Sequence, residues 1–270
     1  MTSLLQISDL HFGTEQPDVM AALQALSFDK KPDVLMVSGD ITQRATADQF
    51  SSAKAFCDSL KIERMVSLPG NHDIPLFNLF ARVLRPYAAY RKAFGQMLES
   101  ELITPTLCLV TVNTTRWWRH KNGEVSAAQI DRVCKQLSCA TPEQLRMVVV
   151  HQPVHVLRPQ DEHDRLRGWE PAVRAWAAAG ADIVMGGHIH LPYVCELSST
   201  VSKLKRRMWC VQAGTAVSSR IRREAPNSVN LIEFDFDADG VRCCVERWDY
   251  QKAGNKFQLA HTSVLNLQRQ

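Results

Sequence analysis

Short apolar runs that end in glycine, aspartate, asparagine or histidine constrain the fold of this chain more than any other feature. In chain order the endings are Asp9-Leu10-His11, Gly39-Asp40, Gly70-Asn71-His72-Asp73, His151 and Gly187-His188-Ile189-His190. Over residues 1–73 the runs alternate with stretches of helical periodicity, which predicts parallel strands covered on both faces. Glycine precedes Asp40, Asn71 and His188, as expected where the chain turns sharply off a strand.

Seven residues at these endings carry side chains that bind metal ions. They are Asp9, His11, Asp40, Asn71, His151, His188 and His190. Carboxylate and imidazole together suit divalent transition metals, and seven ligands are more than one ion needs. The economical arrangement is two adjacent cations that share Asp40, and such a site activates water and stabilises in-line displacement at phosphorus. Any one of these residues alone could be a cap, a turn residue or a core histidine, but the ordered set predicts a metal site.

Apolar runs continue along the chain and predict its fold class. The expected elements after residue 104 are strands at 107–112, 147–150, 183–185, 209–212, 230–236 and 241–247, and helices at 126–137 and 170–179. Helical crossovers early and hairpins late favour two packed sheets. We therefore expect an α/β fold, a four-layer αββα sandwich of two mixed β-sheets flanked by helices. No linker or repeat divides the chain, so a single domain is expected over residues 1–270.

Three further segments carry expectations of their own. Residues 74–104 should form a mostly helical insert, with helices at 76–84 and 87–101. The tetrapeptide Asp237-Ala238-Asp239-Gly240 lies between two alternating runs and predicts a hairpin. The last twenty residues show no periodicity that predicts an element.

Composition excludes several classes of protein. The formal net charge is +4, and the only dense basic cluster is residues 203–207, which we expect in a solvated loop rather than a nucleic-acid groove. No segment reaches the ~18 apolar residues of a membrane span, so no membrane partner is expected. The N-terminus has no leader pattern and the eight cysteines include no CxxC pair, which favours reduced thiols and a cytoplasmic location.

The ordered motifs resemble those of the calcineurin-like metallophosphoesterase superfamily from Leu4 to about Thr215. The likeness is to the bacterial branch of class III cyclic-nucleotide phosphodiesterases and glycerophosphodiesterases. It implies a first metal bound by Asp9, His11 and His190, a second bound by Asn71, His151 and His188, and Asp40 as the bridge. It also places His72 on the substrate side, to stabilise the phosphate or protonate the leaving oxygen, and the insert 74–104 near the mouth. Asp73 should support the turn, and a hydroxide held by the cations should be the nucleophile.

Two departures from related patterns are informative. The protein-phosphatase branch reads GDxxDRG, and this chain has Gln43 in place of the second aspartate, which argues against a phosphoprotein phosphatase. Arg44 could still approach the phosphate, although an exposed loop arginine is the commoner case. Many bacterial relatives have His-His-Pro where this chain has His151-Gln152-Pro153, and the ligand histidine is retained.

Residues outside the motifs offer further substrate contacts. Trp117 and Trp118 follow a strand end among basic residues, and could stack a nucleobase or pack beneath a loop. Arg220, Arg222 and Arg223 could help to hold an anionic substrate.

The sequence therefore predicts a metal-dependent phosphodiesterase that binds two divalent ions (Mn, Fe or Zn) and acts on a small-molecule phosphodiester. A diester carries one negative charge, which suits two cations with few additional basic groups. A cyclic nucleotide is the first expectation, and it rests on the resemblance. A glycerophosphodiesterase, a nuclease and a phosphomonoesterase are alternatives. A non-catalytic scaffold on this fold would usually have lost His72 or several ligands, which are all present here.

Overall fold

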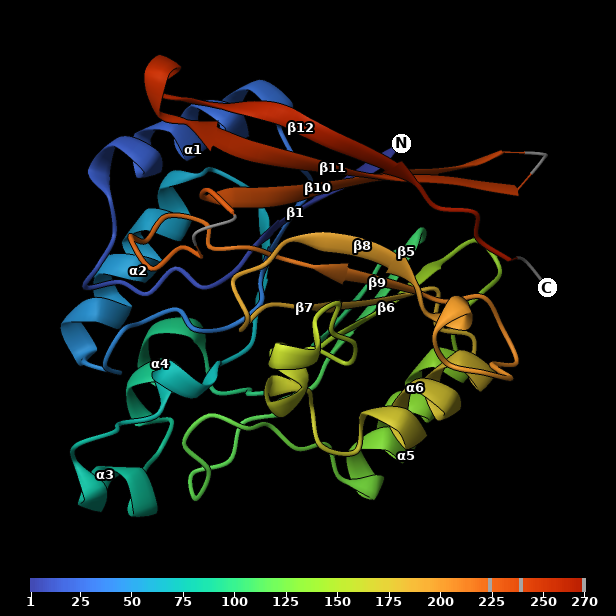
Figure 1. The fold of residues 1–270 in the computed structure, drawn as a ribbon, viewed down its shortest axis with the longest axis horizontal. Helices are drawn as coiled ribbons and strands as arrows, with labels where there is room; N and C mark the ends of the chain where they lie inside the picture. The colour runs from blue at the N-terminus through green and yellow to red at the C-terminus, as the bar shows by residue number, and fades with distance from the viewer. Residues whose placement is uncertain (223–224, 238–239, 269–270) are drawn as a thin grey trace.

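The computed structural model describes residues 1–222, 225–237 and 240–268. Two mixed six-stranded β-sheets pack face to face and helices cover both outer faces, so the αββα sandwich is confirmed (Figure 1). In spatial order the first sheet contains β12 (Lys256–Val264), β11 (Gly240–Gln251), β10 (Ser228–Asp237), β1 (Thr2–Ile7), β2 (Val34–Val37) and β3 (Arg64–Ser67). The second contains β4 (Glu101–Ile103), β5 (Leu107–Thr111), β6 (Leu145–Val149), β7 (Ile183–Gly186), β9 (Trp209–Gln212) and β8 (Tyr193–Glu196).

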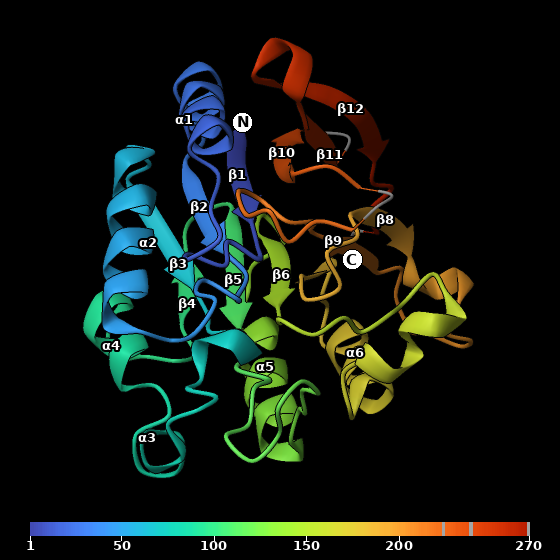
Figure 2. The ribbon, with the colours of Figure 1, turned by 60° about the vertical axis from the view of Figure 1, so that its left-hand side comes forward.

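Helices divide between the two outer faces (Figure 2). They are α1 (Pro17–Lys30), α2 (Ala47–Ser59), α3 (Leu79–Leu84), α4 (Ala88–Phe94), α5 (Ala127–Ser138) and α6 (Trp169–Ala178). Residues of α1, α2 and α4 pack with the outer side of the first sheet, whereas α5 and α6 pack on the second. The early strands β1, β2 and β3 are parallel, as the alternation of strands and helices predicted.

The hydrophobic core is layered because side chains along a strand alternate between its two faces. In β1, Leu5 belongs to the core beneath the helices and Leu4 to the core between the sheets. In β6, Met147 faces the core between the sheets and Val148 the core beneath α5 and α6. Successive side chains of a strand point to opposite faces, so a continuous apolar run contributes to two cores at once.

A buried polar bridge joins the two sheets near the carboxyl ends of their central strands. Gln6 of β1 is fully buried, and its amide donates to the Gly186 carbonyl oxygen (3.1 Å) at the end of β7. Asn230 of β10 donates to Gln6 Oε1 (2.9 Å) and to the Gln212 carbonyl oxygen (3.3 Å). These bonds fix the ends of β1 and β7 relative to each other, and the polar motifs follow those ends.

Several elements differ from the expectations. The insert 74–104 is less helical than predicted: α4 ends at Phe94, and the chain then forms the edge strand β4 beside β5. The C-terminal region, where no element was predicted, forms β12. Its side chains are mostly exposed because β12 is an edge strand that pairs only with β11, so no apolar alternation marks it.

Two further expectations concern loops. Strands β10 and β11 pair antiparallel down to Asp237 and Gly240, as the hairpin prediction requires, while its two central residues lie outside the described residues. The basic cluster 203–207 is not wholly solvated, because Arg206 is buried and its guanidinium contacts Asp182 at 2.5 Å. Every cysteine is free, and no helix among the described residues is long and apolar enough to cross a membrane.

We expect Gln6→Leu to lower the free energy of unfolding by about 2 kcal/mol, because the substitution leaves the Gly186 carbonyl and the Asn230 amide buried without this partner. Urea denaturation measures the change. Gln258→Leu, on an exposed position of β12, serves as the matched control. Equal losses in the two variants would contradict a structural role for the bridge.

Candidate metal centre

Six of the seven predicted ligands come together where strands of both sheets end, and the seventh, Asn71, follows the end of a neighbouring strand. Asp9 and His11 follow β1, Asp40 follows β2, and His188 and His190 follow β7. Asn71 follows β3 and His151 follows β6 directly. Potential ligand atoms form two groups, and the atoms inside each group all lie within 4.8 Å of one another. Asp40 is the residue that belongs to both groups. The groups are Asp9, His11, Asp40 and His190, and Asp40, His151 and His188.

The two carboxylate oxygens of Asp40 face different groups. Asp40 Oδ1 lies 3.3 Å from His151 Nε2 and accepts a hydrogen bond from the His72 backbone N–H (2.8 Å). Asp40 Oδ2 lies 3.7 Å from His11 Nε2. Burial opposes ionisation of Asp40, but His151 and His72 outweigh burial and hold its pKa well below the usual range. Asp40 is therefore a buried anion positioned between two sets of ligands.

Carbonyl groups fix the orientation of two of the histidines. His151 Nδ1 lies 2.9 Å from the Ser38 carbonyl oxygen, to which its N–H donates. His190 Nδ1 similarly contacts the Arg220 carbonyl oxygen. In both rings Nε2 is directed into the centre, and in the neutral ring it offers a lone pair there, which is the usual arrangement of a metal-binding imidazole.

His11 and His190 contact each other through their Nε2 atoms within the first ligand group. Their Nε2 atoms lie 3.2 Å apart, and His190 Nε2 lies 3.4 Å from Asp9 Oδ1. Burial lowers the pKa of His11 well below its usual value, although Asp40 acts in the opposite direction. A neutral His11 offers a lone pair rather than a second proton, so the pair suits a shared cation.

The ligand set fits divalent metal ions because several of its buried atoms have no hydrogen-bond partner among the described residues. These atoms are His11 Nδ1, Asn71 Oδ1, His151 Nε2 and His188 Nδ1. A buried polar atom without a partner costs about 1–3 kcal/mol. The neighbouring Asp40 overcomes burial and raises the pKa of His151 to about 9, which shows how strongly the carboxylates attract positive charge.

The backbone at five of these residues is left-handed. Asp9, His11, Asp40, His188 and His190 have φ values of 53°, 43°, 49°, 74° and 56°. Residues other than glycine rarely adopt this region, and such strain is concentrated at functional sites. The side chains of Asp9 and His11 nevertheless belong to the same ligand group.

The glycines before the ligands have two different roles. Gly39 has a φ of +96°, a backbone angle that favours glycine, which agrees with the sharp turn expected before Asp40. Gly70 has an extended backbone, and a Cβ at this position would overlap the backbone nitrogen and Oδ1 of Asp40. Gly187 likewise lies against the side chains of Ser8 and Asp9. Close approach of adjacent loops, not a turn, requires glycine at these two positions.

Asp73 supports the loops, as expected. Its carboxylate accepts hydrogen bonds from the backbone N–H groups of Gly70 (2.8 Å), Ile41 (3.0 Å) and Thr42 (2.8 Å), and from the Thr42 hydroxyl (2.8 Å). Burial and the nearby Asp40 raise the pKa of Asp73 to about 6, against the effect of these donors. Asp73 thus clasps the loop after β2 to the loop after β3.

His72 lies at the edge of the ligand cluster and contacts Arg220. The ring centroids of His72 and His11 are 4.8 Å apart. His72 Nδ1 lies 3.2 Å from the Gln43 carbonyl oxygen, and Arg220 Nη1 lies 3.3 Å from His72 Nε2. Arg220 Nη1 also donates to Gln43 Oε1 (2.8 Å). Gln43, the residue that departs from the protein-phosphatase pattern, therefore contacts both His72 and Arg220.

Sequence reasoning missed Asp164. Its Oδ1 lies 3.5 Å from His188 Nε2 and 2.7 Å from Lys121 Nζ. Burial would raise the pKa of Asp164, but the contacts to His188 and Lys121 hold it at about 2. Asp164 orients the His188 ring from outside the centre. It ends a short 3₁₀ helix, Pro159–Asp164, whose sequence shows no apolar periodicity, so the sequence gave no signal.

The predicted substrate contacts differ in their surroundings. Arg44 is exposed and its guanidinium lies over the Phe77 ring, 5.0 Å from the centroid. Trp117 and Trp118 are exposed and contact each other edge to face at 5.5 Å. Arg222 donates to Asp161, and Arg223 lies outside the described residues. The roles of Arg44, Trp117 and Trp118 stay predictions.

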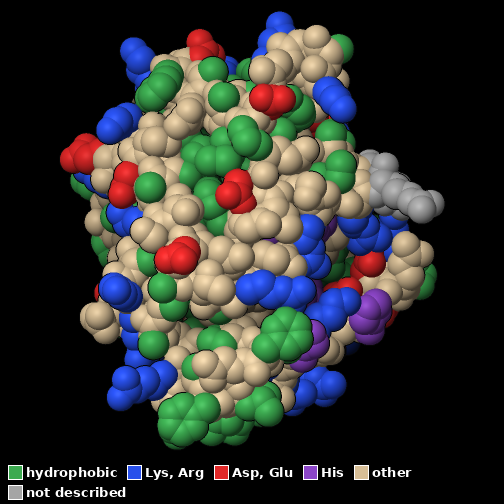
Figure 3. Space-filling model, turned by 90° about the vertical axis from the view of Figure 1, so that its left-hand side faces the viewer, with side chains coloured by type: hydrophobic (Ala, Val, Ile, Leu, Met, Phe, Trp, Pro, Cys, Tyr) green, Lys and Arg blue, Asp and Glu red, His purple; other side chains and the backbone are tan. Residues whose placement is uncertain are grey.

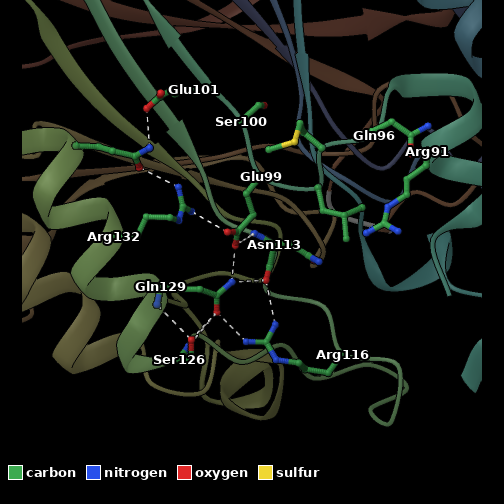
Figure 4. A pocket seen from close by; sticks show the side chains of 13 residues that line it. Arg91, Gln96, Glu99, Ser100, Glu101, Asn113, Arg116, Ser126, Gln129 and Arg132 are labelled. Atoms are coloured by element: carbon green, nitrogen blue, oxygen red, sulfur yellow. Dashed lines mark hydrogen bonds and ion pairs between the residues drawn. The ribbon is translucent and has the colours of Figure 1, made fainter. Parts of the chain in front are cut away.

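A cavity of about 830 Å³ lies elsewhere, between the insert and the start of α5 (Figure 4). Its polar side chains bond to one another: Arg132 pairs with Glu99 at 3.0 Å, and Arg116 donates to Gln129 at 2.8 Å. None of the seven candidate ligands lines it. The cavity is therefore separate from the candidate metal centre.

Comparisons with known proteins place the chain among phosphoesterases. Residues 2–192 match a family model described as calcineurin-like phosphoesterase. The chain is 19% identical over 206 residues to a Rhodococcus erythropolis protein described as a probable cyclic nucleotide phosphodiesterase. That match covers 75% of this chain and 66% of the relative, just under two thirds of its length.

Solved structures share the fold at low sequence identity. A purple acid phosphatase from yellow lupin (Lupinus luteus) seeds superposes with a TM-score of 0.72 at 12% identity, over 97% of this chain and 53% of that protein. A dimetal phosphatase from Danio rerio superposes with a TM-score of 0.69 at 12% identity, over 99% of both chains. Vacuolar Protein Sorting 29 from Cryptosporidium parvum gives a TM-score of 0.51 at 14% identity, over 97% of both. At these identities the likeness establishes the fold alone.

We expect the purified protein to bind two divalent ions per chain and Asp40→Ala to lose both, because Asp40 belongs to both ligand groups. Elemental analysis of dialysed protein measures the content. Glu63→Ala, at an exposed position, should retain both ions. A folded Asp40→Ala protein that keeps two ions would remove the bridging assignment.

Asp73→Asn should lower the free energy of unfolding by about 2–3 kcal/mol, because an amide offers one acceptor oxygen and turns its NH₂ group toward backbone donors. Chemical denaturation measures the loss. Asp58→Asn removes an exposed carboxylate paired with Lys54 and should cost far less. Equal decreases in the free energy of unfolding of the two variants would show that Asp73 does not join the two loops.

Proposed function

The chain belongs to the calcineurin-like phosphoesterase family, and on that premise we propose that it is a metal-dependent phosphodiesterase. The observation that carries the proposal is the pair of ligand groups that share the buried Asp40. Asp9, His11 and His190 hold one divalent ion, and Asn71, His151 and His188 hold the other. Mn, Fe and Zn are all compatible with these ligands. Two such ions, when bound, activate water and neutralise charge on a phosphoryl group.

His72 is the residue we assign to proton chemistry. Hydrogen bonding of Nδ1 to the Gln43 carbonyl oxygen leaves Nε2 as the atom that exchanges a proton with the substrate. Nε2 lies beside Arg220, whose guanidinium is the nearest side chain suited to bind a phosphoryl oxygen. The oxygen atoms of an anionic substrate accept a hydrogen bond from the Arg220 guanidinium more strongly than His72 Nε2 does. Once Arg220 binds it, protonated Nε2 can donate to the leaving oxygen.

A diester is a better substrate for this arrangement than a phosphoprotein. A phosphodiester carries one negative charge, and Arg220 is the cation that directly adjoins His72. Gln43 replaces an aspartate of the protein-phosphatase pattern and uses its side chain to hold Arg220. The name of the Rhodococcus relative supports a cyclic nucleotide as the first substrate to test. Trp117 and Trp118 are exposed aromatic side chains that a base could stack on.

Other functions remain open on the same fold. The same metal chemistry hydrolyses glycerophosphodiesters, short nucleic-acid strands and phosphomonoesters. Enzymes for these substrates differ in which part of the substrate the loops around the metal centre bind. A non-catalytic scaffold is disfavoured because the ligands and His72 are all present. A cytoplasmic location is part of this proposal and rests on the free cysteines.

We expect His72→Ala to keep its metal content while kcat falls by ~10²–10⁴, the usual contribution of a general acid. The loss should shrink for a p-nitrophenyl diester, whose leaving group needs little protonation. His261→Ala, an exposed histidine on β12, is the matched control. If good and poor leaving groups lose rate equally, His72 positions the phosphate instead. A normal rate in both would remove His72 from the mechanism.

A hydrolysis panel tests the function itself. Metal-reconstituted protein is assayed with 3′,5′- and 2′,3′-cyclic nucleotides, glycerophosphodiesters, single-stranded DNA and a phosphomonoester. We expect the highest kcat/KM for a diester, with cyclic nucleotides first, and loss of activity after chelation. A preference for the monoester would contradict the phosphodiesterase assignment. No hydrolysis of any ester by protein that holds two ions would favour the scaffold.

A further inference from the structure

An exposed apolar surface lies around α3 and the loop at 114–122. Its side chains are Phe77, Leu79, Phe80, Val83, Leu84, Trp117 and Trp118, and we call this set the α3 face. Phe77 and Phe80 expose 76% and 77% of their surfaces. Apolar side chains gathered in this way on a soluble protein usually mark an interaction surface.

The two segments form one continuous surface. Arg82 of α3 donates to the Arg119 carbonyl oxygen (2.7 Å), and the Tyr87 hydroxyl contacts Thr115 Oγ1 at 2.8 Å. Figures 1 and 2 both show the 114–122 loop beside α3, at the end of the molecule opposite α1. Phe77, Phe80 and Leu84 also line a groove of about 880 Å³ that extends to Arg44.

Cations accompany these apolar side chains. Residues 74–98 expose Arg85, Arg91 and Lys92, bury Arg82, and have no aspartate or glutamate. Nearby acids are already paired, since Glu124 contacts Arg119 and Asp164 contacts Lys121. Figure 3 shows hydrophobic side chains gathered at the lower end of the molecule, with lysine and arginine side chains around them and no acidic side chain among them. The surface is therefore apolar with a positive rim.

We propose that the α3 face docks on an anionic lipid bilayer. Phenylalanine and tryptophan insert at the boundary between headgroups and acyl chains, and the rim arginines and lysines attract the negative leaflet. Leu79, Val83 and Leu84 fit acyl chains, whereas nucleic-acid bases would stack only on the aromatic residues. The absence of a long apolar run led us to expect no membrane partner. Contact with a bilayer surface needs no membrane-spanning segment.

The charges argue against a second copy of this chain as the partner. In a symmetric dimer the same surface meets itself. Residues 74–98 carry cations without acidic residues, so self-association would place like charges opposite each other, which is unfavourable. An anionic partner meets no such penalty.

The groove gives this docking a relation to the candidate metal centre. Arg44 lines the groove, and the preceding residue, Gln43, contacts His72. A bilayer under the α3 face would therefore lie beside the loop that carries the substrate side of the centre. The docking itself does not depend on which ester the centre hydrolyses, so it can be tested separately.

Vesicle sedimentation tests the proposal. The full chain is mixed with vesicles of phosphatidylcholine, or of equal parts phosphatidylcholine and phosphatidylglycerol. We expect binding to the anionic vesicles that weakens as salt is raised, and much weaker binding to the neutral ones. The double substitution Phe77→Ser and Phe80→Ser should lower the partition coefficient at least about tenfold, and Arg85→Gln about fivefold.

Phe28→Ser provides the matched control, because Phe28 is 53% exposed on α1. It should leave binding unchanged, and thermal unfolding checks that all variants fold. A wild-type protein that stays unbound with both vesicles at low salt would overturn the proposal, as would equal losses in the Phe28 and Phe77/Phe80 variants. Light scattering that shows a dimer, made monomeric by the Phe77/Phe80 substitutions, would assign the surface to a second copy.

Discussion

The burial of the Asp40 carboxylate is the constraint on which the rest of the centre depends. A buried anion needs positive charge or donated hydrogen bonds close by, and Asp40 receives a bond from the His72 backbone and two imidazoles at its oxygens. The surrounding histidines direct further lone pairs inward, so the side chains alone leave the site short of cations. Two divalent ions, as proposed, would resolve this shortage, and the candidate ligands that would hold them come from the ends of strands in both sheets.

The scaffold around Asp40 holds this arrangement against backbone strain. Five ligand residues have left-handed backbones, and neighbouring loops approach so closely that Gly70 and Gly187 have no room for a side chain. Asp73 joins two of the loops through hydrogen bonds, and Gln6 ties the strands that carry them. The packing of the two sheets thus holds these residues in backbone conformations that an isolated loop would not adopt.

Arg220, beside the centre, contacts both a candidate metal ligand and His72. Arg220 accepts a hydrogen bond from His190 through its carbonyl, while its guanidinium reaches His72 and Gln43. Further out, Arg44 lines the groove shared with the α3 face. The candidate ligands thus lie at the strand ends, whereas the groove is lined by residues of the insert and of the loop after β2.

The sequence by itself determined the fold class, the order of the strands that carry the motifs, the seven candidate ligands and the supporting role of Asp73. These follow from local patterns, since apolar periodicity and the residue after a strand are both readable along the chain. Only the tertiary structure decided the left-handed backbone at the ligands, the contact of Asp164 with His188 and the edge strand β12. It also decided that Arg220 meets His72 and that the apolar side chains of α3 remain uncovered. Each depends on residues distant in sequence, whose approach is set by the packing of the two sheets and has no local signature.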